Sequence, residues 1–346
     1  MTLRIVTTEP LNAEAPLAAL SGSITPVEDF YVRNNFIPPD LDAESWRLRV
    51  HGLVRSPLTL DLADLRQLPR VSRRVTLECA GNGRRLMDPT PGGTAWELGA
   101  AGTALFTGTR LRDVLARAGP ASDAVDCVFT GADSGTVERA GAGGPETVSF
   151  QRSLAISHAR SDEPMLAWEM NGAPLTRDHG FPVRLVVPRF YAVASVKWLV
   201  DLKVVDRPFA GHFQAERYVY RGPGIGEHPV TTMRVRALIT SHSDGQRLAG
   251  GAVGLEGVAW SGEAPVTRVR VRVDGTAWRD AELESGEAGV MVGWRCDCRL
   301  EPGEHEVTVV ATDDAGSSQP LAPRWNELGY GNNVAQTIRL HASGTP

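Results

Sequence analysis

One cysteine lies in a loop whose composition suits metal binding. The segment Glu78–Arg85, ECAGNGRR, follows an apolar stretch and places Cys79 among small residues. Its two glycines let the backbone approach a ligand closely. Its two arginines favour the thiolate form, because positive neighbours lower a thiol pKa. A thiolate is a soft donor for a metal centre. Taken alone, however, the pattern is more often that of a buried structural cysteine before a turn.

Length and composition indicate a globular protein of about two domains. The chain has 346 residues and a net charge of −5, with 42% hydrophobic and 22% charged residues. These values are ordinary for a folded globular protein. Because no basic stripe stands out, no nucleic-acid partner is expected. Arg268, Arg270 and Arg272 alternate with valines, which is typical of the wet face of a strand. No apolar run approaches the roughly 20 residues of a membrane span, so no membrane partner is expected either.

The N-terminus and the cysteines bear on the cellular compartment. The first residues lack a basic stretch followed by an apolar core, so we predict no signal peptide. A cytoplasmic location is expected, or a periplasmic one if an export signal has been removed. Four cysteines, at positions 79, 127, 296 and 298, are too few for a disulfide framework. Cys296 and Cys298 are expected to share one face of a strand, since no second cysteine or histidine pair suggests zinc.

The elements that must position Cys79 show mixed character. WRLRVHGLV alternates like a strand, DLADLRQLP is typical of a short helix, and RRVTLEC predicts a strand that runs into the cysteine loop. RLRDVLARAG predicts a helix that ends at Gly119. Residues 131–146 are predicted to form a long glycine-rich loop, and PVRLVVP and SVKWLVDLKVV to form strands. The pattern indicates an α+β domain with a mixed sheet.

The last third of the chain changes character. GPGIGEHPV, residues 222–230, is predicted to be a linker. Beyond it, short alternating runs such as VTRVRVRVDGTAW and HEVTVVATDDAG follow one another, and Asp274-Gly275 is a strong hairpin signal. We therefore predict an immunoglobulin-like β-sandwich. The predicted organisation is an extended lead-in over residues 1–29, an α+β domain over 30–225 and the sandwich over 226–346.

Four segments, in this order, resemble the sulfite oxidase family. They are YVRNNF at 31–36, ECAGNGR around Cys79, MNGAPLTRDHGFPVRLVVP at 170–188 and SVKWL at 195–199. With the sandwich, the resemblance covers about residues 30–342. It implies a mixed-sheet molybdopterin-binding domain followed by an immunoglobulin-like dimerisation domain, and therefore a homodimer. It also implies molybdenum and molybdopterin as cofactors, with Cys79 as the protein's ligand to the metal.

The resemblance also implies which residues meet the cofactor and the substrate. Those implied for the cofactor are Asn34, Asn35, Phe36, Asp133, His179, Arg184, Ser195 and Lys197. Those implied for the substrate pocket are Arg33, Arg84, Trp96 and Tyr218. Arginine suits this pocket because its planar guanidinium can give two hydrogen bonds to an oxyanion.

At two positions the sequence departs from the family's pattern. Asn35 stands where the family usually has histidine, so it can form hydrogen bonds but carries no charge. In the segment PRWNELGYGNN, Leu328 stands where the family has an arginine that reaches the substrate anion. Losing one cation predicts weaker anion binding.

The implied reaction is oxygen-atom transfer that oxidises sulfite, a small oxyanion, to sulfate. No C-x-x-C-H haem motif occurs, so the electrons are expected to pass to an external acceptor such as a cytochrome or oxygen. Related chemistry on the same scaffold stays open, namely sulfane dehydrogenation or reduction of nitrate or a sulfoxide. A non-catalytic binding protein is the alternative from another class.

Overall fold

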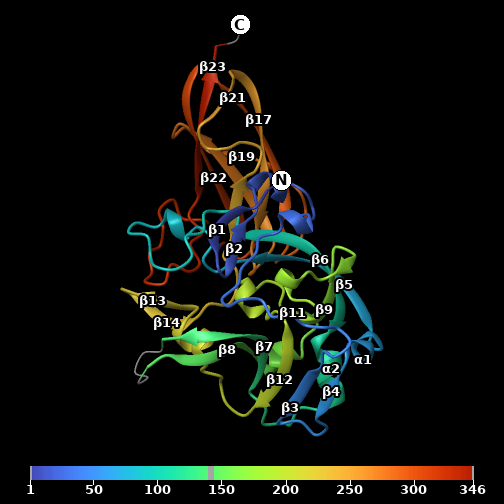
Figure 1. Cartoon of the computed structure of the whole chain (residues 1–346). Helices are drawn as coiled ribbons and strands as arrows, with labels where there is room; N and C mark the ends of the chain where they lie inside the picture. Colours follow the sequence, from blue (N-terminus) through green and yellow to red (C-terminus); the bar gives the residue numbers. More distant parts are fainter. Residues whose placement is uncertain (1, 139–143, 345–346) are drawn as a thin grey trace.

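The computed structural model describes residues 2–138 and 144–344 and has an α+β part and a β-sandwich (Figure 1). The sandwich, orange to red in the figure, extends away from the α+β part and carries the C-terminus. The chain begins where the two parts meet, with a hairpin of β1 (Arg4–Thr8) and β2 (Leu11–Glu14). This lead-in is not simply extended: its hairpin is bonded to the α+β part, where the Ala13 N–H donates to the Val32 carbonyl and the Ala15 N–H to the Gly99 carbonyl, both at 2.9 Å.

Two five-stranded sheets build the α+β part. The first has the order β10-β9-β6-β5, with β11 also paired to β9. Its strands are β5 (Arg70–Glu78), β6 (Ala101–Arg110), β9 (Met165–Met170), β10 (Ala173–Pro174) and β11 (Arg184–Val186). The second has the order β4-β3-β12-β7-β8. Its strands are β3 (Leu48–Gly52), β4 (Leu58–Leu60), β7 (Asp126–Val137), β8 (Glu146–Ala155) and β12 (Leu199–Val205). Since β3 and β12 are parallel and the other pairs antiparallel, the predicted mixed sheet is confirmed.

The helices are short and end where the sequence indicates. In α1 (Leu62–Arg66), Asp61 and Asp64 each accept a hydrogen bond from the other's backbone, which forms a capping box. In α2 (Leu111–Ala118), Gly119 follows in the left-handed region with φ 65°, a conformation that favours glycine. Within residues 2–138 and 144–344, the remaining α-helix is α3 (Ile156–Ala159). Both predicted helices are confirmed.

The C-terminal part is a sandwich of two sheets, with the orders β15-β17-β21-β20 and β16-β23-β22-β18-β19. Its strands are β15 (Arg236–Ile239), β16 (Gln246–Ala249), β17 (Gly251–Trp260), β18 (Val266–Val273), β19 (Arg279–Asp280), β20 (Glu282–Leu283), β21 (Val292–Leu300), β22 (Gly303–Asp313) and β23 (Gln336–Ser343). Asp274 and Gly275 have φ 49° and 68° in the turn after β18, as the hairpin signal predicts. Cys296 and Cys298 lie buried on one face of β21. The predicted fold class is confirmed.

Two predicted irregular segments are regular structure. Residues 131–137 are not loop but the end of β7, where Gly135 and Thr136 pair with Val148 and Thr147 of β8. The rest of that predicted loop includes residues 139–143, which lie outside the described residues. The predicted linker at 222–230 is largely a hairpin of β13 (Val219–Gly222) and β14 (Ile225–Pro229). In both cases pairing with a neighbouring strand outweighs the glycine content.

The hydrophobic core continues across the boundary between the two parts. The main buried cluster joins Leu202 and Val204 of β12 to Leu238, Val258 and Trp260 of the sandwich. A second cluster fills the sandwich itself. Such a continuous core fixes the two parts relative to each other.

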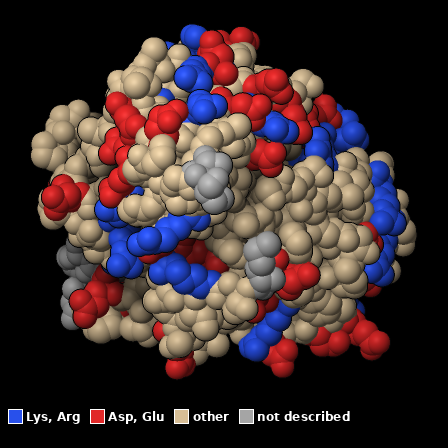
Figure 2. All heavy atoms as spheres, turned by 90° about the horizontal axis from the view of Figure 1, so that it is seen from above, with Lys and Arg blue, Asp and Glu red and all other residues tan. Residues whose placement is uncertain are grey.

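One face of the molecule shows how its charged side chains are distributed. Lys and Arg side chains are interspersed with Asp and Glu over the face in Figure 2, without one sign covering it. Among the described residues, no helix is long and apolar enough to span a bilayer.

We predict that Gly108→Ala destabilises the fold. A Cβ at Gly108, where β6 and β9 shift register, would lie 1.9 Å from the Leu166 carbonyl oxygen and 2.7 Å from the Ala167 Cα. Because both are backbone atoms, the sheet must move, at a cost of about 1–3 kcal/mol or more. Thermal denaturation should show a lower Tm. Gly226→Ala, whose Cβ meets nothing within 4 Å, is the control, and equal Tm values would contradict the prediction.

Candidate active site

Cys79 lies where two cavities meet. It follows the last residue of β5 and is 5% exposed. One cavity, of about 660 Å³, extends from it into the α+β part, and we call it the inner cavity. The other, of about 1250 Å³, we call the outer funnel. Cys79, Arg33, Asn35 and Tyr218 line both, so a group bound to the thiol would contact both spaces.

The residues predicted for the site divide between these cavities. The inner cavity also contains Asn34, Asp133, His179, Arg184, Ser195 and Lys197. The outer funnel also contains Phe36, Arg84, Trp96 and Leu328. The structure therefore brings every predicted site residue to one continuous space. Their roles in binding stay predictions.

Two cations of the inner cavity, the buried Arg184 and the half-buried Lys197, donate their hydrogen bonds to neutral acceptors. Arg184 is 4% exposed and donates to the carbonyls of His179 at 3.0 Å and Ser195 at 3.1 Å. Lys197 Nζ donates to the carbonyls of Arg33 at 2.9 Å and Asp178 at 2.7 Å. It also donates to the side-chain oxygen of Asn34. Neutral acceptors orient these groups without cancelling their charge, so the cavity favours an anionic ligand.

Burial shifts the pKa of several groups around this cavity. It lowers the pKa of Lys197 well below its usual range, with Arg184 acting in the same direction. It also lowers the pKa of Arg184 to about 10 and that of His179 to about 3. For Asp133, burial raises the pKa to about 6, although Lys197 opposes this shift. Each shift reports the cost of holding a charge away from water.

Three side chains at the junction of the cavities share hydrogen bonds. Arg33 Nη2 donates to the Asn35 Oδ1 at 2.6 Å and to the Tyr218 hydroxyl at 3.2 Å. The Tyr218 hydroxyl in turn donates to Asn35 Oδ1 at 3.2 Å. Tyr218 has φ 54° and follows the π-helix His212–Glu216. Strained backbone and π-helical turns are features that gather at functional sites.

Arg84 is held by backbone carbonyls at the wall of the funnel. Its Nη1 donates to Thr94 at 2.7 Å, while Nε and Nη2 donate to Leu328 at 3.2 and 3.0 Å. Its guanidinium also lies 5.1 Å from the centre of the Tyr330 ring. Of its five N–H donors, two remain for a ligand. Leu328 therefore positions Arg84 through its carbonyl.

The pKa of the Cys79 thiol differs from the lowered value that the neighbouring arginines predict. Burial raises its pKa above the usual range, while Arg33 and Arg84 act in the opposite direction and Glu78 adds to the rise. The predicted lowering by nearby arginines is therefore present but smaller than the effect of burial. A bound cation would be needed to hold the thiolate form.

Several residues of this space carry no strong sequence signal. His212, Phe213, Arg217 and Tyr330 line the funnel, and Tyr31 lines the inner cavity. The segment HFQAER, which directly precedes Tyr218, contains His212, Phe213 and Arg217 and was the sequence signal that could have indicated them. Tyr330 could have been found from its position two residues after Leu328.

The site fits a phosphate-bearing molybdopterin. The hydrogen-bond partners of Arg184 and Lys197 are neutral, so both positive charges can pair with an anionic cofactor. The buried Asp133 Oδ1 has no hydrogen-bond partner among the described residues, and its residue lines the inner cavity. It can accept from a ring N–H. Trp96 Nε1, in the funnel wall, likewise has no partner within the described part of the chain.

Comparison with known proteins supports the same interpretation. Residues 35–213 match the oxidoreductase molybdopterin binding domain, and residues 227–343 match the Mo-co oxidoreductase dimerisation domain. The chain belongs to the sulfite oxidase family. Molybdopterin with molybdenum is therefore the cofactor that this domain indicates.

Three relatives illustrate the range of the family. The mitochondrial sulfite oxidase of Mus musculus is 36% identical over 99% of this chain and 66% of its own length. The sulfite oxidase of Gallus gallus is 35% identical over 94% and 75%. The crystal structure of the sulfane dehydrogenase SoxCD from Paracoccus pantotrophus superposes with a TM-score of 0.85 at 27% identity, covering 97% of this chain and 87% of that one. The chain spans about two thirds of the length of the mammalian relatives.

We predict that His179 makes the cofactor-free protein sensitive to acid. Its pKa is about 3 in the folded protein, against a usual value of 6.5. Between these values the unfolded chain takes up a proton that the folded protein does not, so the free energy of unfolding falls as the pH falls. In His179→Gln this dependence should be shallower in urea denaturation between about pH 7 and about pH 4.

The raised pKa of Asp133 acts in the opposite sense, but it is present in both proteins and largely cancels in the comparison. Parallel pH profiles for the two proteins would contradict the prediction.

Proposed function

We propose that this protein is a molybdenum-cofactor oxidoreductase that oxidises sulfite to sulfate. The observation that carries the proposal is Cys79, placed between a cation-lined inner cavity and a funnel bearing Arg33 and Arg84. The predicted division into a lead-in (1–29), a molybdopterin domain (30–225) and a dimerisation domain (226–346) is part of the same proposal.

The inner cavity would hold the cofactor through charge and hydrogen bonds. Arg184 and Lys197 would bind its phosphate, and Asp133 would accept a hydrogen bond from the pterin. His179 and Ser195 orient Arg184 through their carbonyls, and the Ser195 hydroxyl accepts from the Val187 N–H at 3.0 Å. When bound through Cys79, molybdenum supplies oxygen-atom transfer coupled to the uptake of two electrons.

In the funnel, the chain's own residues would bind and orient the anion. The net reaction is SO₃²⁻ + H₂O → SO₄²⁻ + 2H⁺ + 2e⁻, with both electrons leaving to an external acceptor. Arg33 carries its charge beside Cys79, and the two free donors of Arg84 can bind an oxyanion. The Tyr218 hydroxyl can exchange its bond to Asn35 for one to a substrate oxygen. Charged groups that are fixed in position before the reaction begins stabilise the transition state, and this is a large source of rate enhancement.

The direct test is metal content together with substrate preference. Protein from a host able to make the cofactor should contain about one molybdenum per chain, since it has one thiolate ligand. Sulfite, sulfane sulfur compounds, nitrate and sulfoxides should then be compared, with sulfite expected to react fastest. Negligible molybdenum would refute the proposal and would favour the alternative of a non-catalytic binding protein.

Sulfane dehydrogenation is the second candidate function. The funnel is open to solvent, and Leu328 gives its wall an apolar residue. The structural similarity to the sulfane dehydrogenase SoxCD, at 27% identity, also favours this candidate. Faster turnover of a sulfane compound than of sulfite would favour this candidate.

We predict that Cys79→Ser loses activity by orders of magnitude while retaining most of the pterin. Serine replaces a soft sulfur with a hard, mostly protonated oxygen, a poor ligand for this metal. Arg184 and Lys197, which would bind the phosphate, are unchanged. Activity assays and fluorescence analysis of released pterin measure the two effects. Near-normal turnover would contradict the role of Cys79.

We predict an elevated KM for sulfite that Leu328→Arg lowers. The position lines the funnel, so an added guanidinium can reach a bound anion. One charge-assisted hydrogen bond contributes ~1.5–3 kcal/mol, or about ten- to a hundredfold in affinity. Because the new side chain leaves Cys79 unchanged, kcat should change less. Steady-state kinetics of both proteins check this. A KM that is already micromolar, and unchanged by the arginine, would show that anion binding has another source.

We also predict a homodimer formed through residues from about 231 onward. The match to a dimerisation domain supports it, and two-fold dimers are the commonest oligomers. Light scattering at about micromolar concentration should give twice the chain mass; a monomer mass would count against it.

A cytoplasmic location stays a prediction, consistent with four cysteines that are all free and buried. Cell fractionation would test it.

A further inference from the structure

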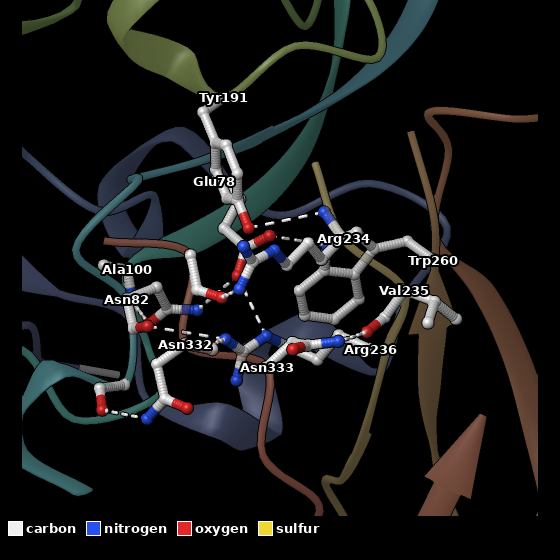
Figure 3. A network of polar contacts seen from close by, with 12 residues as sticks. Glu78, Asn82, Ala100, Tyr191, Arg234, Val235, Arg236, Trp260, Asn332 and Asn333 are labelled. Atoms are coloured by element: carbon white, nitrogen blue, oxygen red, sulfur yellow. Dashed lines mark hydrogen bonds and ion pairs between the residues drawn. The ribbon is translucent and has the colours of Figure 1, made fainter. Parts of the chain in front are cut away.

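The residue before Cys79 is a carboxylate paired across the boundary with the sandwich. Glu78 is fully buried, and Arg236 of β15 is 1% exposed. Arg236 Nε lies 2.9 Å from Glu78 Oε1, and Trp260 Nε1 of β17 donates to Oε2 at 3.0 Å. Asn82, in the cysteine loop itself, donates to Oε1 at 3.0 Å. Figure 3 shows these side chains converging from both parts of the molecule.

The backbone of the cysteine loop is held by the same part of the chain. The Ala80 carbonyl accepts from the Gly331 N–H at 2.7 Å. The Gly83 carbonyl accepts from the Asn332 side-chain amide at 2.7 Å, and the Asn82 carbonyl from Arg236 Nη2 at 3.4 Å. Arg236 also donates to the Asn332 carbonyl, so the two residues that bind the loop are bonded to each other. Three of the four carbonyls that follow Cys79 are thus fixed by the segment 331–332 and by β15.

This arrangement has an electrostatic consequence as well as a geometric one. A buried carboxylate beside a ligating thiolate adds negative charge where charge affects the metal most strongly. Arg236 cancels that charge and simultaneously fixes the loop. Removing either partner would leave the other buried and unpaired, which is costly for the fold.

We propose that Arg236 is a positioning residue for Cys79, and that the sandwich sets both the placement and the local charge of the thiolate through Arg236 and Glu78. This role goes beyond assembly of a dimer. It rests on the proposed function, in which Cys79 is the metal ligand.

The test is the midpoint potential of molybdenum in charge-changed variants, followed by electron paramagnetic resonance during a redox titration. Glu78→Gln leaves Arg236 unbalanced and should shift the potential upward. Arg236→Gln leaves Glu78 unbalanced and should shift it downward. The double variant restores neutrality and should return toward the parent value.

Turnover gives a second measure. In Arg236→Gln, kcat for sulfite should fall about ten- to a hundredfold with a smaller change in KM, because small misplacements of a reacting group carry such costs. Arg234→Gln is the matched control. It removes a cation two residues before Arg236, ahead of β15, that donates to the Gly331 carbonyl at 2.8 Å and forms no ion pair with Glu78 within the described part of the chain. It should leave the potential close to that of the parent.

Asn332→Ala provides a further test in case the Glu78 or Arg236 variants fail to fold. It keeps the ion pair but removes the hydrogen bond to Gly83, and it should change the g-values of the reduced metal. Parent-like potentials in Glu78→Gln and Arg236→Gln, or equal shifts of one sign, would overturn the inference. So would parent-like g-values in Asn332→Ala. A parent without molybdenum would instead overturn the proposed function, and this inference with it.

Discussion

Uncancelled positive charge inside the α+β part is the constraint on which the rest of the structure depends. Arg184 is buried and Lys197 half-buried, yet their hydrogen-bond acceptors are neutral carbonyls and an amide. The lowered pKa of each reports that cost in the cofactor-free protein. Such a cavity is stable only because sheets from distant parts of the chain enclose it. A bound phosphate would offset the cost, so cofactor binding and folding stability are linked.

The sandwich completes the site from the other side. The main core extends from β12 to Trp260, so the two parts cannot shift independently without exposing apolar surface. Across that boundary the carbonyls of the cysteine loop accept hydrogen bonds from Gly331 and Asn332, and Arg84 donates to Leu328. A domain named for assembly therefore also contributes to the wall around Cys79.

The sequence predicts best where a local signal and the tertiary environment agree. The strand that runs into Cys79 and the helix that ends at Gly119 follow from periodicity and a glycine cap. The strand at 131–137 and the hairpin at 219–229 were missed because pairing with a neighbour decides them, not composition. Motif resemblance led to residues that the structure gathers around Cys79. It did not lead to Tyr330, whose place in the funnel depends on how the sandwich packs against the loop.

The asparagine at position 35 has a physical account in the geometry. A carbonyl oxygen has two lone pairs and can accept two hydrogen bonds, whereas a neutral imidazole nitrogen accepts one. Asn35 Oδ1 accepts from both Arg33 and Tyr218, and Arg33 also donates to the Tyr218 hydroxyl. The three groups therefore form a closed set that needs no added charge. Because Asn35 is neutral, the positive charge of Arg33 stays available to an anion in the funnel.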